Sequence, residues 1–196
     1  MPMRALMAAA FIAATLGAPV AFAADSASPP ASVAPINPEK PVRLNRLFAA
    51  LQIAPSPEAG KAIEQDILAE WLRSGDVEVD QLMASAIQQM DIGLPSLALG
   101  TLDTIVARRP DYIEGWNKRA TLYFYVGAYD KSLADIAATL QLDPRHFGAL
   151  AGLGMIMVKY GDRSRALTAF ERAYAVDPEL DDIRQTIDLL KGGKDI

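Results

Sequence analysis

The fold of this chain is decided by the stretch from Ile113 to His146, which reads IEGWNKRATLYFYVGAYDKSLADIAATLQLDPRH. Apolar residues at helical spacing predict one helix before Gly127 and a second helix after it, which ends at Asp143-Pro144. Landmark residues recur at intervals of 34 on both sides. They are Gly93, Gly127 and Gly161; Pro110, Pro144 and Pro178; and Leu82, Trp116 and Leu150. A shared period of this length indicates a helical repeat array.

Other positions of the period predict how each helical hairpin packs. The glycines should end the first helix in a left-handed conformation, where a side chain would be strained. Polar residues three positions later are predicted N-caps of the second helix: Ser96, Asp130 and Ser164. Small residues occupy two further positions and should let the two helices approach closely. They are Ala86, Ala120 and Gly154; and Ala98, Ser132 and Ala166.

These residues resemble the tetratricopeptide repeat (TPR), a 34-residue pattern of large, small and aromatic residues that closes on a proline. The middle unit carries the pattern as Trp116, Ala120, Tyr123, Gly127, Tyr129, Ser132 and Pro144. The resemblance implies an all-α solenoid of helical hairpins. In composition the chain is also similar to small periplasmic TPR proteins of alphaproteobacteria, a group associated with cell-envelope integrity.

The period divides the chain into units. We expect three repeats, at 79–112, 113–146 and 147–180. The helix pair predicted within 41–78 keeps the period only in part, so we interpret it as a degenerate first unit that caps the array. The segment 181–196 is predicted to form a C-terminal capping helix, because Asp188 stands at a small packing position and would solvate that face.

The N-terminus has the features of a secretory signal peptide. Arg4 precedes an apolar, alanine-rich run, and Ala21-Phe22-Ala23 fits the small-x-small cleavage rule. We expect cleavage after Ala23, with 1–23 removed and 24–40 left as an Ala/Ser/Pro-rich linker. The run is short against the roughly 20 residues of a membrane span. The mature protein is therefore expected in the periplasm, without stable membrane insertion.

Composition excludes several classes of partner. The chain has 24 acidic and 19 basic residues and a net charge of −5, which disfavours nucleic acid and anionic lipid surfaces. It contains no cysteine, so disulfides, thiol nucleophiles and cysteine-based metal sites are excluded.

The first helix of each repeat is the expected binding element. By position in the TPR family, it would line a concave groove for an amphipathic helix or an extended peptide. The predicted groove residues are Met83, Ile87, Met90, Asn117, Thr121, Phe124, Tyr125, Met155, Val158 and Lys159. An alternative is that some of these side chains belong to the core between helices.

The sequence predicts no enzyme. It has no GxSxG or HExxH motif and no cysteine–histidine pair, and its carboxylates fall at predicted caps and turns. His146 is the only histidine, so metal ligation is not expected, and we interpret it as a solvated loop residue. We expect no catalytic residue, metal or cofactor.

The predicted function is therefore a non-enzymatic periplasmic scaffold that binds a protein or peptide through its concave groove. By resemblance, its role would lie in maintenance or assembly of the cell envelope. Two alternatives remain open. One is a structural protein that self-associates into a homo-oligomer through the groove, and the other is an accessory subunit of an envelope enzyme or secretion complex.

Overall fold

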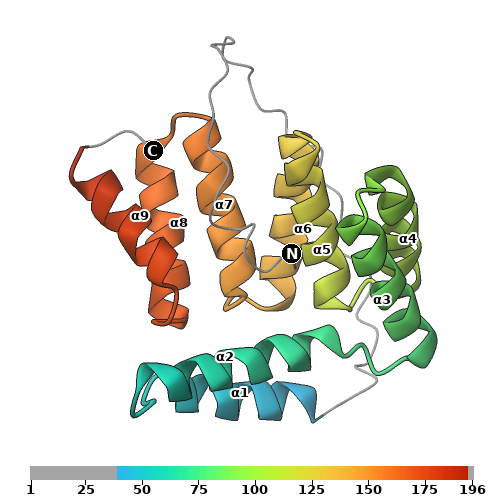
Figure 1. Ribbon diagram of the computed structural model, residues 1–196, viewed down its shortest axis with the longest axis horizontal. Coiled ribbons are helices and arrows are strands. Elements are labelled where there is room, and N and C mark those ends of the chain that lie inside the picture. The colour runs from blue at the N-terminus through green and yellow to red at the C-terminus, as the bar shows by residue number, and fades with distance from the viewer. Residues whose placement is uncertain (1–38, 194–196) are drawn as a thin grey trace.

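A computed structural model describes residues 39–193. The predicted signal peptide at 1–23, nearly all of the 24–40 linker and the last three residues of the C-terminal cap lie outside the described residues. Within the described part, the chain is built entirely from helices and their connections (Figure 1). The helices are α1 Lys40–Leu51, α2 Pro57–Leu72, α3 Val77–Asp91, α4 Pro95–Arg108, α5 Ile113–Tyr125, α6 Tyr129–Leu142, α7 Phe147–Lys159, α8 Arg163–Val176 and α9 Asp181–Lys191. The prediction of an all-α fold is confirmed.

The helices from α3 to α8 pack as three successive hairpins, α3–α4, α5–α6 and α7–α8. Each hairpin turns at a glycine with positive φ, which is 74° at Gly93, 76° at Gly127 and 72° at Gly161. The left-handed turn lets the chain re-enter a helix almost at once. The second helices therefore begin before the predicted caps, and the N-cap residues are Leu94, Ala128 and Asp162. The prediction of N-caps at 96, 130 and 164 is wrong.

The small residues lie where the two helices of a hairpin meet. Ala86, Ala120 and Gly154 are buried, and a Cβ on Gly154 would come within 2.5 to 2.7 Å of three ring carbons of Phe170. In the middle hairpin, Ser132 Oγ donates a hydrogen bond to the carbonyl oxygen of Ala120 at 2.8 Å. Tight contact between the helices therefore depends on the absence of larger side chains.

The α3–α4 hairpin begins the stack, because polar residues stand on α3 where the later repeats have apolar residues that pack against a preceding repeat. Leu122 and Ile156 occupy one position of the period and are 4% and 0% exposed, because each packs into the core that it shares with the preceding repeat. The corresponding residue of the first repeat is Gln88, which is exposed. Similarly, Ala149 is 1% exposed while Gln81, at the same position of the first repeat, lies in solvent. Glutamine at both places provides a polar end to the stack, as repeat arrays require.

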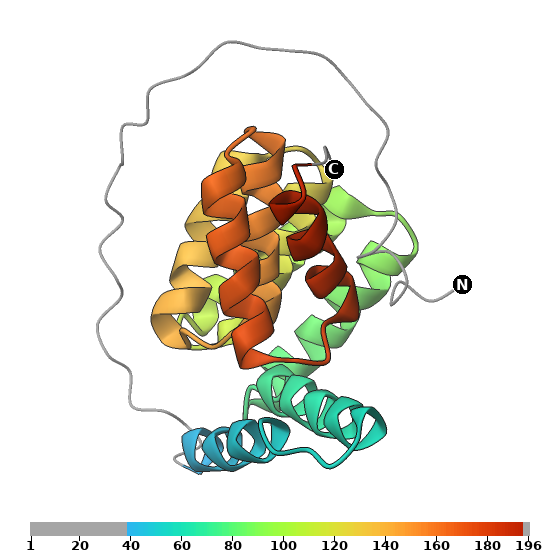
Figure 2. The same cartoon turned by 90° about the vertical axis from the view of Figure 1, so that its left-hand side faces the viewer.

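The α1–α2 hairpin lies crosswise beneath the repeats (Figures 1 and 2). The sequence predicts a degenerate first unit that caps the array, whereas the hairpin lies across the ends of the repeats and does not stack on α3. The stack already ends at the polar face of α3, so the apolar side of the hairpin packs elsewhere. It buries Leu44, Phe48, Leu51, Ile67 and Trp71 against Phe147, with Ile113, Val176 and Leu180 at the margin.

The hairpin crosses all three connections that lead out of the repeats. Three residues at one position of the period, 112, 146 and 180, meet it in turn. Tyr112 Oη donates to the carbonyl oxygen of Leu72 at 2.5 Å, His146 stacks on Trp71, and Leu180 packs against the apolar cluster of the hairpin. The hairpin therefore acts as a strap, and we use "strap" below for residues 40–72.

The last helix, α9, packs on α8 (Figure 2). Its Ile187 and Leu190 are buried in the core shared by the second and third repeats, while Asp188 is exposed. No helix of the part at 39–193 is both long and apolar enough to cross a membrane.

Candidate functional site

The predicted groove residues lie on the first helices α3, α5 and α7, and we call the surface that these helices carry the first-helix face. Two of the ten residues are buried: Met83 is 1% exposed in the core of the first repeat, and Asn117 is 9% exposed. Asn117 Nδ2 donates to Glu114 Oε2 at 3.0 Å. These two side chains contribute to packing in the folded protein and are not available at the surface.

The remaining eight residues reach the surface to different degrees. Tyr125 and Lys159 are exposed. The others are partly buried: Ile87, Met90, Thr121, Phe124, Met155 and Val158. Ile87 and Met90 flank the core of the first repeat, whereas Phe124, Met155 and Val158 flank the core shared by the second and third repeats. The structure therefore divides the predicted set between two neighbouring regions.

Aromatic rings connect the second and third repeats at the hairpin-turn end of this face. The Phe124 ring lies 6.3 Å from that of Tyr125 and 5.5 Å from that of Tyr129, and Tyr129 lies 6.2 Å from Tyr160 in an edge-to-face contact. Tyr160 Oη also donates to Asp130 Oδ1 at 2.7 Å. We call Phe124, Tyr125, Tyr129 and Tyr160 the aromatic ladder.

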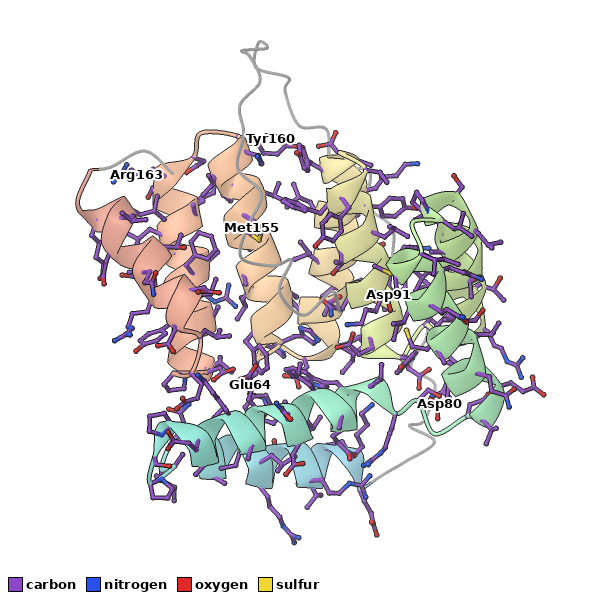
Figure 3. All side chains as sticks on the ribbon, in the orientation of Figure 1. Glu64, Asp80, Asp91, Met155, Tyr160 and Arg163 are labelled. Atoms are coloured by element: carbon purple, nitrogen blue, oxygen red, sulfur yellow. The ribbon has the colours of Figure 1, made fainter. Side chains whose placement is uncertain are left out.

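The aromatic ladder leaves substantial apolar surface accessible. Tyr125 is 45% exposed and Tyr160 is 47% exposed. Figure 3 shows Tyr160 at the upper end of α7 and Met155 lower on the same helix. Large aromatic side chains with one polar atom are suited to protein interfaces. Tyr129 and Tyr160 stand beside the hairpin turns and are not among the predicted groove residues, because their ring contacts form only in the folded chain.

A second group of functional-looking residues is buried between the strap and the repeats. His146 Nε2 lies 3.1 Å from Glu114 Oε1, and His146 Nδ1 accepts a hydrogen bond from the backbone N–H of Ala149 at 3.1 Å. Because Nδ1 is an acceptor at the start of α7, the proton of the neutral ring belongs on Nε2, where it is donated to Glu114. His146 is 1% exposed, so the prediction of a solvated loop residue is wrong.

Glu114 is a buried carboxylate with several partners. Burial alone would raise its pKa, but Lys118, whose Nζ lies 3.4 Å from Oε2, and hydrogen bonds from His146 and Asn117 hold the pKa well below its usual range. The carboxylate is thus ionised and fully engaged at neutral pH. This arrangement fixes the start of α5 against the start of α7 and holds the ring that stacks on Trp71.

The remaining candidate sites in the described part are a possible metal site and a surface depression. Among residues 39–193, no group of three or more His, Asp or Glu side chains has the geometry to hold a metal ion. A shallow, open depression of about 290 Å³ lies on the strap and is lined by Arg43, Arg46, Leu47, Asp66, Ala69, Glu70 and Arg73. Its central carboxylate, Glu70, already accepts hydrogen bonds from Arg43 and Arg73.

The packed hairpins and the first-helix face define a helical-repeat scaffold of the TPR type. No family model matches the chain. A TPR repeat-containing protein of Rhizobium etli is 39% identical over 136 residues, which cover 69% of this chain and 67% of that protein. The human Superkiller complex protein 3 is 24% identical over 106 residues, but the match covers only 7% of that protein.

Two solved structures have a similar fold. The crystal structure of MamA protein has a TM-score of 0.55 and 18% sequence identity, and the match covers 79% of this chain and 82% of that one. The MamA RS-1 ArsTM double mutant matches with a TM-score of 0.54 and 19% identity over 82% of this chain and 87% of that one. The chain belongs to the tetratricopeptide repeat family. It is a protein-binding scaffold of this family, whose members are typically non-catalytic.

Proposed function

We propose that this protein is a periplasmic, non-enzymatic scaffold that binds a protein or peptide through its first-helix face and serves maintenance or assembly of the cell envelope. The aromatic ladder carries the proposal: Tyr125 and Tyr160 are 45% and 47% exposed and are linked through Phe124 and Tyr129. Rings held by their neighbours lose little conformational freedom on binding, which favours affinity.

The neighbouring residues suit a partner with an apolar strip. Phe124, Met155 and Val158 are partly buried around the ladder, and methionine adapts its shape to different ligands. A partner with apolar side chains would therefore match this part of the face.

In-cell photo-crosslinking tests this proposal. A photoreactive amino acid at position 125 or 155 should give a covalent adduct with one partner, whereas the same residue at the exposed second-helix position 137 should not. Equal capture from position 137, or none from 125 and 155, would contradict binding through this face. An adduct at twice the mass of the chain would instead identify self-association.

The periplasmic location rests on the sequence of the N-terminus, with Arg4, the apolar run and Ala21-Phe22-Ala23. Mass spectrometry of protein from the periplasmic fraction should find a chain that begins at Ala24. A full-length chain that fractionates with the cytoplasm would contradict export.

A further inference from the structure

The strap meets the third connection, 177–180, along a seam that is crowded with carboxylates. Glu64 of α2 is half-buried there, and Figure 3 shows it on the side of α2 that faces the lower ends of the repeats. Glu179 lies so close to the backbone of α2 that a Cβ on Gly60 would clash with its carboxylate. Asp177 completes the group and is 0% exposed.

Asp177 lacks one of the hydrogen bonds that its burial demands. Its Oδ1 accepts from the backbone N–H of Glu179 at 3.0 Å, but Oδ2 has no hydrogen-bond partner among the described residues. An ionised carboxylate oxygen that is buried without a donor is costly. A proton on Oδ2 would remove the negative charge and so lower the cost of burying this oxygen.

The seam has too few positive charges to balance its carboxylates. The facing groups are Lys61 and Glu64 on α2, Asp177 and Glu179 in the connection, and Asp181 at the start of α9. Lys61 is the one cation that acts on Glu64 among these groups, and its side chain is 55% exposed and lies 3.8 Å from Asp181. Negative charges therefore outnumber positive charges where the strap contacts the third repeat.

Burial and repulsion raise the pKa of both acids. Desolvation and the charges of Asp177 and Glu179 raise the pKa of Glu64 to about 7, while Lys61 opposes the shift. Desolvation raises the pKa of Asp177 to about 6; the hydrogen bond from the backbone N–H of Glu179 opposes this shift, and the charge of the Glu179 carboxylate adds to it. Both groups therefore change their charge between mildly acidic and neutral pH.

The other end of the strap, near Trp71, does not meet the repeats through crowded carboxylates. Tyr112 Oη of the repeats donates to the carbonyl oxygen of Leu72 at 2.5 Å, and within the strap Lys40 Nζ ties α1 to the end of α2 by donating to the carbonyl oxygens of Trp71 and Arg73 at 3.2 and 2.7 Å. The stack of Trp71 on His146 adds apolar contact. One half of the strap is thus anchored to the repeats by a hydrogen bond and a ring stack, whereas the other half meets them at the crowded acids.

We propose that the N-terminal half of α2 is a proton-operated latch: uptake of a proton by the Glu64–Asp177 pair seats it on the third connection, and ionisation of both acids releases it. The anchored Trp71 end serves as the hinge side. Release would uncover Val176 and Leu180, which pack against the strap. The neutral bond from Gln52 Nε2 to the carbonyl oxygen of Val176, at 2.8 Å, would have to break in the same movement.

The direction of the pH effect follows from the raised pKa values. A carboxyl whose pKa is higher in the seated form favours that form at low pH. The contribution of Glu64 is complete below its unperturbed pKa of 4.5 and is lost as the pH rises through about 7. The contribution of Asp177 is lost through about pH 6.

Hydrogen exchange of the full folded chain tests the latch. After correction for intrinsic rates, amides of 57–66 should lose protection on the order of tenfold between pH 6 and pH 8, while those of α5 should not. Glu64→Gln should abolish this difference and remain protected at pH 8. Asp66→Asn, on an exposed part of the same helix, should behave as wild type.

Three outcomes would overturn the proposal. One is wild-type protection of 57–66 that does not depend on pH, and another is a full pH dependence that survives in both Glu64→Gln and Asp177→Asn. The third is protection at pH 8 that millimolar Mg²⁺ or Ca²⁺ restores in wild type, because the seam would then be a cation site. Circular dichroism of each variant checks that the repeats remain folded.

Discussion

The indole of Trp71 stacks on the imidazole of His146, with ring centroids 4.1 Å apart and planes 19° from parallel. The same indole N–H points to Asp143 Oδ2 at 3.4 Å. Trp71 is 0% exposed, although it comes from a helix outside the three repeats. This pair is therefore the main junction between the strap and the connection that joins the second and third repeats.

Removal of this junction should destabilise the protein strongly. We expect Trp71→Ala to lower the free energy of unfolding by about 3–5 kcal/mol, because it leaves a large cavity beside His146. Urea unfolding measures the loss. Leu68→Ala on the same helix, where the side chain is 38% exposed, is the control and should cost far less. Equal effects of the two variants would show that docking of the strap adds little stability.

Two helical glycines should respond oppositely to alanine. Gly154→Ala should lower the free energy of unfolding by about 1–3 kcal/mol, because its Cβ would overlap the Phe170 ring. Gly100→Ala should raise it by about 0.5–1 kcal/mol, because no atom lies within 4 Å of the new Cβ and alanine favours the helix. Thermal and urea unfolding compare the two. A neutral Gly154→Ala would contradict the close helix packing.

Two residues of the predicted groove should separate stability from binding. Met83→Ala should lower the free energy of unfolding by about 2–5 kcal/mol, since Met83 lies in the core. Tyr125→Ala should change it by only about 0.5 kcal/mol, since the ring is 45% exposed, yet it should abolish crosslinking from position 155. Undiminished crosslinking in Tyr125→Ala would argue against the aromatic ladder as the contact.

The protein should lose stability in acid through Glu114. Its pKa is lowered in the fold, so the stabilisation is present above the unperturbed value of 4.5 and is lost as the pH falls below it. Glu114→Gln should cost about 1–3 kcal/mol at pH 7 and should flatten the decline between pH 5 and pH 3. Urea unfolding across this range provides the measurement. Glu171→Gln at the surface is the control and should retain the full decline.

The sequence predicted the repeats well because their signals are local. A glycine 34 residues from the next glycine specifies a turn in each hairpin, and Ala120 opposite Ser132 specifies close packing within one unit. Each of these signals acts over a short stretch of chain, so it can be read without knowledge of the rest of the fold. The N-caps were misplaced by two residues because the turn at glycine is tighter than the spacing suggested.

The candidate site was predicted only in part. Periodicity identified the first helices but could not tell that Met83 is covered by its neighbours whereas Tyr125 is exposed. Tyr129 and Tyr160 joined the site only through ring contacts between different helices. The exposure of a side chain on a first helix depends on which residues cover it, and the way successive repeats stack determines those residues.

By itself the sequence determined the family and the hairpins, because periodic apolar residues and glycines act within or next to their own repeat. Only the tertiary structure decided where the strap lies. Its apolar side could have covered any face that the repeats left open, and the choice depended on contacts such as Trp71 with His146, which are 75 residues apart in the chain. Long-range packing of this kind leaves no period in the sequence.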